Sequence, residues 1–400
     1  MSLEWKSCKI GDVVSVRRGS SPRPIKDYVS ETGMPWVKIA DATKDQTRFI
    51  NFTSEFIKEE GIEKSVVVNP GDLIVSNSAT PGLPKFMNIK ACVHDGWLVF
   101  DSYNGILKDF LYYYFIVIRG RLVNQANGSV FKNLKTDIVR NFDINLPDLE
   151  TQEKIVKILS QIDKKIETNI KINKNLDELL MSIFKSWFVY FDDIDEFKSD
   201  ENLGKIPKSW SVEMLEDYVD FVTGVEPGSK NYHEKNKEND IPFIRVGDLG
   251  PRDNSVFIDK SVSKNKILKY EDIVLSMDAT IGIVKMGLEG AYSTGMRKLV
   301  IKNDSINKPF LYCLVKSERI QRIIETFATG TTILHAGKSI KHMNFVLSDE
   351  ITMENFGKIG ENILTQILSN MREIEKMTQL RDILLPKLMS GEIDVSKINY

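Results

Sequence analysis

The stretch ATGTTILHAGKS at 328–339 has the residue types of a nucleotide-phosphate site. Its glycines could offer backbone N–H groups to a phosphate, while Lys338 and Ser339 could add a cation and a hydroxyl. A phosphate-binding loop needs its glycines close enough for successive N–H groups to curl round one phosphate. Gly330 and Gly337 lie too far apart for the G-x-x-x-x-G-K pattern, so the spacing argues against an ATP site.

A second pattern has the spacing of a metal-dependent nuclease: Pro147-Asp148 followed by Asp163-Lys164-Lys165. Such a site needs two carboxylates that converge on one metal ion from a strand hairpin. Asp163 and Lys165 fall instead within a helical pattern of apolar residues, and the second half of the chain has no equivalent. The match is therefore interpreted as accidental.

The residue spacing also gives no support for a cysteine or histidine metal site or for a methyltransferase site. The cysteines Cys8, Cys92 and Cys313 are far apart and form no CxxC pair, and the four histidines show no HExxH spacing. A methyltransferase would need a (D/N)PP(Y/F) motif to hold a flipped base, and the sequence has none. We expect the chain to be no enzyme and to hold neither a metal nor a cofactor.

The composition excludes a strongly basic, free-standing nucleic-acid binder. The chain has 400 residues, 42% of them hydrophobic, a formal net charge of −2 and a pI near 6.2. Any binding of a polyanion must come from local clusters of Lys and Arg or from a partner subunit. The longest apolar run, at 110–118, is too short to cross a bilayer, and the N-terminus lacks a signal peptide. These features predict a cytoplasmic protein without a membrane partner.

The sequence repeats itself in unbroken order at a spacing of about 200 residues. The rare tryptophans Trp5 and Trp210 take part in this repeat. The longer matches are PWVKIAD (35–41) with PFIRVGD (242–248), GDLIVSNSATPG (71–82) with EDIVLSMDATIG (271–282), and KDFLYYYF (108–115) with KPFLYCLV (308–315). The repeat also pairs 328–339 with QANGSVFKNLKT, where the Gly-Lys-Ser end is missing, which again argues against a phosphate loop.

Each half begins with about 150 residues of short strand-like runs separated by turn signals, such as VVSVRR and DLIVS in the first half. Helix-like stretches follow near 108–125 and 308–326. These patterns predict a compact mixed α/β domain in each half.

Each half ends in a helical segment whose apolar positions step by three and four residues, as in a coiled-coil seam. The two seams are Leu159, Ile162, Ile166, Asn169, Asn173, Leu176, Leu180, Ile183 and Trp187, and then Ile363, Ile367, Asn370, Ile374, Met377, Leu384 and Leu388. Arg381 breaks the second seam. The asparagines either lie buried, where they would fix the register, or face water beside the seam, and the sequence leaves both interpretations open.

The predicted fold is α+β: two repeated mixed α/β domains separated by two long helices packed as an antiparallel coiled coil. The predicted boundaries are 1–149 for the first domain, 150–200 for the central helix and junction, 201–350 for the second domain and 351–400 for the C-terminal helix. A helix of about 30 residues spans about 45 Å. Two domains on such a helical pair could read two DNA half-sites about one helical turn apart, although any two-site binding protein would share this design.

Four stretches resemble one known family. EDIVLSMDATIGIVKM (271–286), LLPKLMSGEIDV (384–395), and LLMSIFKSWFVYF (179–191) followed by IPKSWSVEMLEDYV (206–219) resemble signatures of the specificity (S) subunits of type I restriction-modification systems. The resemblance covers essentially the whole chain in that family's order of recognition domain, helix, recognition domain, helix.

The resemblance implies a non-catalytic subunit that binds double-stranded DNA and two methyltransferase (M) subunits. Those partners would bind S-adenosylmethionine and methylate adenine at N6, and an ATP- and Mg-dependent restriction (R) subunit can join the assembly. Each recognition domain would read one half of a bipartite, asymmetric site, and the helices would set the spacer and dock the M subunits. The alternative is a two-headed protein-binding adaptor or scaffold without DNA specificity.

Candidate DNA-binding residues are side chains that donate to guanine, adenine or phosphate from predicted loops and strand ends. They are Arg17, Arg18, Ser20, Ser21, Arg23, Lys38, Asn77, Ser78, Thr80, Lys85 and Lys132 in the first domain, and Lys230, Arg245, Ser276, Thr280, Lys285, Arg297, Thr331 and Lys338 in the second. VRRGSSPRP (16–24) contains three arginines. Its counterpart in the second half, FVTGVEPGS, contains Glu226 and no arginine. Each position could equally belong to an ordinary solvated loop, and Thr80 and Thr280 are better explained as turn residues.

Overall fold

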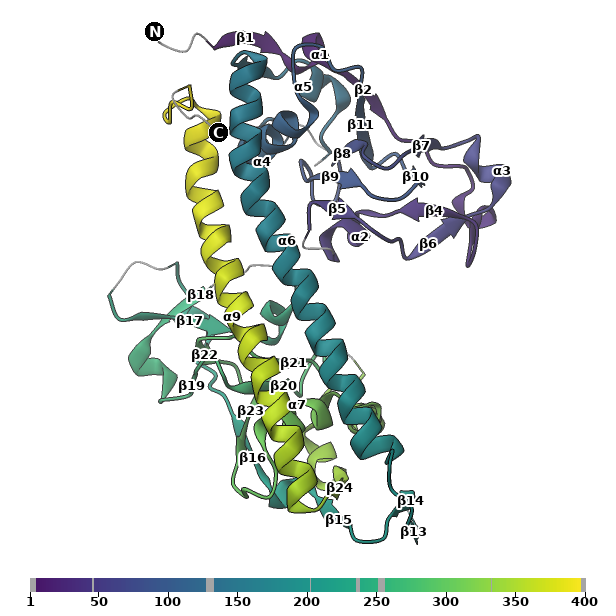
Figure 1. The fold of residues 1–400 in the computed structure, drawn as a ribbon. Coiled ribbons are helices and arrows are strands. Elements are labelled where there is room, and N and C mark those ends of the chain that lie inside the picture. The colour runs from purple at the N-terminus through teal and green to yellow at the C-terminus, as the bar shows by residue number, and fades with distance from the viewer. Residues whose placement is uncertain are drawn as a thin grey trace. The chain divides into compact units, whose positions relative to one another are not determined.

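The structure is a computed structural model that describes residues 5–44, 47–126, 133–201, 203–234, 238–250, 256–331 and 333–396. The chain divides into two compact units, the first formed by residues 1–167 and 376–400 and the second by residues 168–375. Helices α6 (Leu149–Lys185) and α9 (Glu350–Met389) each contribute to both units (Figure 1). Within the described ranges, no helix combines the length and the apolar character that a bilayer crossing requires.

Within its described residues, the first unit contains two five-stranded sheets and one two-stranded sheet. One sheet has the order β2 (Ser15–Arg18), β11 (Trp97–Asp101), β8 (Leu73–Ser76), β9 (Pro84–Met87) and β5 (Phe49–Ile50). The other has the order β3 (Val29–Ser30), β6 (Glu55–Ile57), β4 (Met34–Val37), β10 (Ala91–Val93) and β7 (Val66–Val68). Strand β1 (Lys6–Lys9) pairs antiparallel with β12 (Asp143–Leu146). The helices are α1 (Ile10–Val13), α2 (Ile39–Lys44), α3 (Glu59–Ile62), α4 (Lys108–Ala126) and α5 (Thr136–Arg140), with a 3₁₀ turn at Ile25–Asp27.

Over its described residues the second unit repeats the core of this topology, with four strands in place of five in each of the two larger sheets. One sheet has the order β16 (Val219–Thr223), β23 (Met296–Ile301), β20 (Ile273–Ser276) and β21 (Val284–Lys285). The other has the order β18 (Val256–Asp259), β17 (Asp240–Ile244), β22 (Gly290–Tyr292) and β19 (Ile267–Leu268). Strand β15 (Ser211–Met214) pairs with β24 (Asn344–Leu347) as β1 does with β12. The remaining elements are the hairpin β13 (Phe197–Asp200) and β14 (Gly204–Pro207), helices α7 (Lys308–Lys316) and α8 (Glu318–Thr326), a π-helical turn at Ser186–Tyr190, and 3₁₀ turns at Leu215–Asp217, Ser229–Asn231, Val246–Leu249, Lys260–Ser263 and Gly337–His342.

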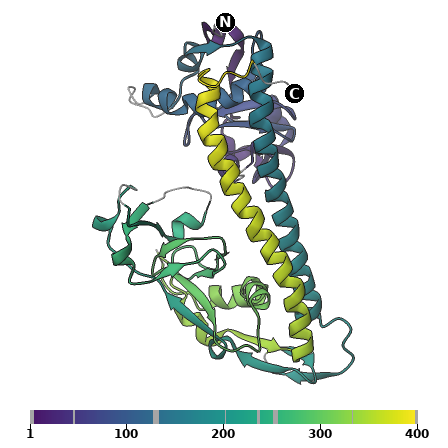
Figure 2. The same ribbon diagram turned by 60° about the vertical axis from the view of Figure 1, so that its left-hand side comes forward.

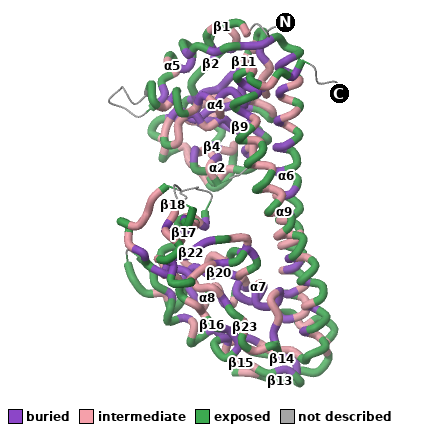
Figure 3. The backbone as a smooth tube through the Cα atoms, turned by 90° about the vertical axis from the view of Figure 1, so that its left-hand side faces the viewer, coloured by how far each residue is buried: buried purple, intermediate pink, exposed green. Residues whose placement is uncertain are grey.

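The repeated sequence therefore folds into two repeated α/β units, as predicted. In each unit a strand of three consecutive apolar residues followed by a serine lies inside its sheet: β8 and β20 are buried at every position. Figure 3 shows buried residues concentrated in these strands and in the helices beside them. Such continuous apolar runs indicate strands that are covered on both faces.

Helix α4 contains the apolar run 110–118 and is a core helix. Phe110, Leu111, Tyr113 and Phe115 are completely buried, because a helix that is apolar on all sides must be surrounded by protein. The equivalent stretch of the second unit is interrupted at Ser317, whose backbone is extended, and so forms α7 and α8 instead of one helix.

Helices α6 and α9 lie side by side in both ribbon views (Figures 1 and 2). In the second unit, Asn169 donates to Glu373 at 2.7 Å and Asn370 donates to Asn173 at 2.8 Å. Residue numbers rise along α6 as they fall along α9, so the helices are antiparallel, as predicted. Asn169 and Asn370 are 2% and 6% exposed, which settles the question left open by the sequence in favour of buried asparagines. Each buried amide group has a partner that a shifted register would remove.

The interruption of the seam at Arg381 also has a structural cause. Asp163 on α6 is buried in the first unit, and its Oδ1 lies 3.1 Å from Nη1 of Arg381 on α9. Tyr113 donates to its other oxygen at 2.7 Å, and Arg48 lies 3.7 Å away. Asp163 is thus committed to a buried ionic network, which agrees with the interpretation of the nuclease-like spacing as accidental.

Candidate nucleic-acid interface

The first unit gathers polar side chains where several strands end. Strands β2, β4, β8 and β10 end at Arg18, Val37, Ser76 and Val93, and the segments that follow them surround a hollow of about 420 Å³. Its lining residues are Ser21, Arg23, Ile25, Trp36, Lys38, Ile39, Ala40, Ser78, Ala79, His94 and Asp95. The structure therefore brings four of the predicted DNA-binding residues, from three separate segments of sequence, to one place.

Asp95 is the centre of this group. Its Oδ1 accepts a hydrogen bond from Ser21 Oγ at 2.7 Å, and its Oδ2 lies 3.6 Å from Nη2 of both Arg18 and Arg23. Its backbone carbonyl accepts from Arg18 Nε at 2.7 Å and from Asn77 Nδ2 at 3.0 Å. Burial raises the pKa of the Asp95 carboxyl, but the hydrogen bond from Ser21 and the nearby arginines outweigh this and lower the pKa below its ordinary value. The carboxylate is therefore held ionised.

His94 borders the same hollow in its neutral form. Burial lowers the pKa of its imidazole below the ordinary value, although the neighbouring Asp95 carboxylate works in the opposite direction. Its Nδ1 accepts a hydrogen bond from the Gly96 N–H at 2.8 Å, which places the ring proton on Nε2. Trp36 packs against the ring with centroids 5.9 Å apart.

Three other predicted contact residues near this edge, two cations and one serine, also have acidic or carbonyl partners. Arg17 Nε lies 3.0 Å from Asp101, and Lys38 forms an ion pair with Glu55. Ser20 Oγ donates to the carbonyl of Lys64 at 2.9 Å. A DNA phosphate would therefore have to compete with carboxylates already present in the unit.

The A-T-x-G segments form the same turn in both units. Ser76 Oγ and Ser276 Oγ donate to the carbonyls of Thr80 and Thr280, and each hydroxyl accepts from a backbone N–H seven residues later. Ala79 and Ala279 adopt positive φ values of 54° and 60°, a conformation that alanine rarely adopts. The structure thus shows both threonines in turns, while leaving the Thr280 side chain exposed.

Three predicted contact residues belong to the interior. Lys85 is 5% exposed and donates to the carbonyl of Thr47, Asn77 is 2% exposed, and Ser276 is completely buried. Lys85 and Ser276 belong to the buried strands β9 and β20, and Asn77 directly follows the buried strand β8, which corrects the expectation that these side chains are exposed for a DNA contact. Lys132, a further candidate, lies outside the described residues.

The second unit presents different chemistry at its equivalent loops. Arg245 makes a bidentate contact with Asp248, at 2.9 and 3.0 Å, and Arg297 donates to the carbonyl of Thr294 at 2.6 Å. The other four candidates are exposed residues: Lys230, Lys285, Thr331 and Lys338. The sequence did not suggest one carboxylate–histidine pair, which joins Asp278 on the turn after β20 to His335 on the segment after α8, at 2.8 Å.

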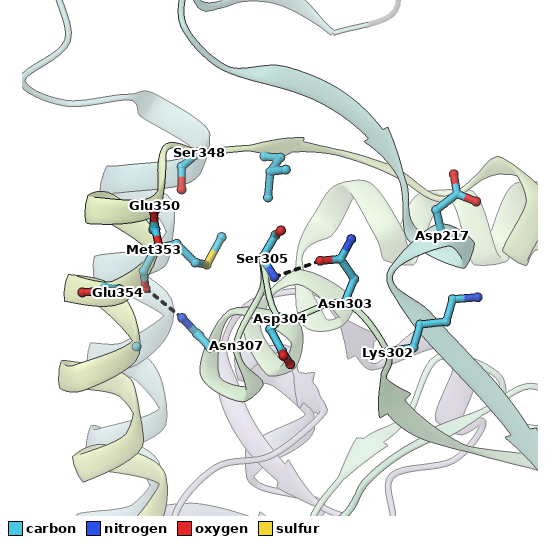
Figure 4. Close-up of a pocket in the computed structure, with 12 residues that line it drawn as sticks. Asp217, Lys302, Asn303, Asp304, Ser305, Asn307, Ser348, Glu350, Met353 and Glu354 are labelled. Atoms are coloured by element: carbon cyan, nitrogen blue, oxygen red, sulfur yellow. Dashed lines mark hydrogen bonds between the residues drawn. The ribbon is translucent and has the colours of Figure 1, made fainter.

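A larger hollow in the second unit has the wrong charge for DNA. It measures about 1020 Å³ and lies between the start of α9 and the loop before α7 (Figure 4). Four carboxylates line it, against the single cation of Lys302: Asp217, Asp304, Glu350 and Glu354. Phosphate groups would be repelled here, so volume alone does not identify a nucleic-acid site.

The part of the chain that the structure describes contains no set of side chains suited to binding a metal ion. Within those residues, no group of three or more His, Cys, Asp and Glu side chains could hold a metal ion. Cys8, Cys92 and Cys313 are free thiols, and burial raises the pKa of each.

Comparison with known proteins points to one family. The family model described as "Type I restriction modification DNA specificity domain" matches residues 2–178 and 207–345, which is once in each half. The MjaIX specificity subunit of a type I restriction enzyme from Methanocaldococcus jannaschii is 26% identical, over 99% of this chain and 95% of its own. The HindI specificity subunit from Haemophilus influenzae is 22% identical, over 98% of this chain and 100% of its own. The crystal structure of a type I S subunit from M. genitalium shares the fold, with a TM-score of 0.56 at 16% identity over 96% of each chain.

Proposed function

Because the chain belongs to the family of type I restriction-modification DNA specificity subunits, which supply the DNA sequence specificity of those enzymes, we propose that each α/β unit reads one half of a bipartite DNA site. The observation that supports this division most strongly is the repeat itself. Two units of one topology carry different side chains at equivalent loops: arginines at 16–24 in the first and Glu226 in the second. One scaffold with two sets of contact residues fits an asymmetric target.

The first unit reads its half-site through the segment that follows β2. Arg18 and Arg23 are 53% and 73% exposed at their side chains, and a guanidinium can donate two N–H groups to one guanine. Ser78 and Lys38 lie around the same hollow. The remaining exposed candidates would contact phosphates and fix the position of the unit on the duplex.

The chain itself performs no catalysis, and two M subunits dock on its helices. Helices α6 and α9 carry large apolar side chains that remain exposed: Ile172, Leu179, Ile351, Ile359, Leu380 and Ile383. Contiguous apolar patches mark protein interaction sites, and the M subunits would cover these side chains on docking. S-adenosylmethionine would be bound by the M subunits, and ATP and Mg by R subunits where these join. The antiparallel helix pair would set the spacer between the two half-sites.

A reconstitution experiment tests this proposal. The chain alone, incubated with DNA and S-adenosylmethionine, should transfer no methyl groups, whereas the chain with its M subunits should methylate a single bipartite sequence. Methylation by the isolated chain would contradict the non-catalytic assignment. An adaptor without DNA specificity would leave the M subunits equally active on every sequence.

A further inference from the structure

Asp95 lies near Arg18 and Arg23 and, among the described residues, leaves some of their N–H groups without a hydrogen-bond acceptor. Ser21 holds Oδ1 at 2.7 Å, and the Asn77 amide group holds the backbone carbonyl at 3.0 Å, so the position of this residue is fixed from two sides. The other carboxylate oxygen lies 3.6 Å from a terminal nitrogen of Arg18 and of Arg23. A separation of 3.6 Å gives electrostatic attraction but no hydrogen bond. Both guanidinium groups therefore keep terminal N–H donors available for another acceptor.

A carboxylate at this place opposes simple DNA affinity. Asp95 is ionised and its side chain is 41% exposed, so it repels the phosphates that Arg18 and Arg23 would attract. A surface selected only for affinity would omit it. Its presence beside two exposed arginines favours a function in discrimination, in which unpaired or repelled groups penalise the wrong partner.

The second unit provides an internal comparison. Gly19 and Gly224 approach equivalent backbone carbonyls, and Gly96 and Gly295 accept hydrogen bonds from equivalent N–H groups after β8 and β20. These contacts align Asp95 with Thr294. In the sequence repeat, Thr223 and Gly228 stand where the first unit has Arg18 and Arg23. The carboxylate and the two arginines are therefore present together in one unit and absent together in the other.

We propose that Asp95 is a specificity-determining residue of the first unit, which positions Arg18 and Arg23 for a guanine of the first half-site and repels phosphates on other sequences. On the correct sequence the base edge accepts from the guanidinium groups, and the carboxylate keeps their direction. On other sequences the arginines stay with Asp95. This inference rests on the proposed function, because it needs the first unit to contact a half-site.

The Asp95→Asn variant tests the proposal in the full chain assembled with its M subunits. Binding is measured by fluorescence anisotropy on three unmethylated duplexes. They contain the sequence that the complex methylates, the same sequence with a guanine of the first half replaced, and an unrelated sequence. Loss of the carboxylate should tighten binding to the unrelated duplex several-fold and should reduce discrimination against the altered first half by about tenfold. Discrimination of the second half should stay unchanged.

Asp143→Asn is the matched control, because Asp143 is a 78% exposed carboxylate of the same unit, paired with Lys9 at 3.4 Å. It removes the same charge and should change neither quantity. Unchanged first-half discrimination in Asp95→Asn, or equal loss of affinity for all three duplexes, would overturn the proposal. Should Asp95→Asn fail to fold, Arg18→Gln and Arg23→Gln serve instead. Each should lose first-half discrimination, and full discrimination in both would overturn the proposal.

Failure of the proposed function has a different signature in this experiment. In that case the wild-type complex would bind all three duplexes equally before any substitution is made.

Discussion

Replacing Asp163 with Asn should release α9 from the first unit. The Asp163 side chain is 3% exposed and contacts Arg381 at 3.1 Å, Tyr113 at 2.7 Å and Arg48 at 3.7 Å. The substitution keeps the size of the side chain and removes its charge. Arg48 retains Glu167 at 2.9 Å, so the residue that loses its buried counter-ion is Arg381.

Removing one partner of a buried ion pair costs about 3–5 kcal/mol. Arg381 is 26% exposed and keeps Asp382 at 2.9 Å, so solvent and this second carboxylate reduce the loss. We therefore expect about 3 kcal/mol, at the lower end of that range. Arg381→Met leaves Asp163 with Arg48 and should cost a similar amount. The double variant should cost about 2 kcal/mol less than the sum, because it removes both charges together.

Amide hydrogen exchange is the suitable assay, because the two units need not unfold together and each segment can be followed separately. Protection should fall in 155–167 and 376–389, while the strands of the second unit should keep theirs. Asp382→Asn, an exposed carboxylate on the same helix, is the control and should change little. Costs of Asp163→Asn and Arg381→Met that add within about 0.5 kcal/mol would refute the reasoning.

Two further predictions concern buried polar groups. Asn370→Leu should destabilise the second unit by about 1–3 kcal/mol, because the side-chain oxygen of Asn173 loses the amide that donates to it. Asn173→Leu/Asn370→Leu should recover this loss in denaturant titrations, and a double variant as unstable as the single one would contradict the register function. Because burial lowers the pKa of His94, the unfolded chain binds a proton below pH 6.5 that the folded chain does not, so stability should fall from pH 6.5 downward. His94→Gln should reduce that fall in melting temperature between pH 7 and 5, and an unchanged pH profile would argue against a neutral His94.

The repeat and the helices could be predicted because their signals are local and periodic. A seam with asparagines at Asn169, Asn173 and Asn370 predicts a paired helix, and the structure adds that Asn169 and Asn370 are buried and that Asn370 donates a hydrogen bond to Asn173. The seam also showed an interruption at Arg381. Its cause, Asp163, lies more than 200 residues earlier in the chain and could be identified only once the helices were paired.

The candidate site was predicted less completely, for the same physical reason. The arginines of 16–24 stand out in the sequence, but Asp95 lies in a short turn whose contact with them depends on the packing of β2 against β11. Lys85 shows the opposite error. A lysine is ordinarily exposed, and the hydrogen bond that this one donates to the carbonyl of Thr47 became visible only in the folded structure. The boundaries at 149/150, 200/201 and 350/351 remain predictions.

The central claim is that the two units read separate halves of one DNA site. Its most direct test exchanges residues 1–149 for the corresponding domain of a relative with a different sequence specificity, and then maps methylated adenines across the genome of a host that also carries the M subunits. The account predicts that one half of the methylated sequence changes while the other half and the spacer stay the same. A change in both halves, or in neither, would contradict it.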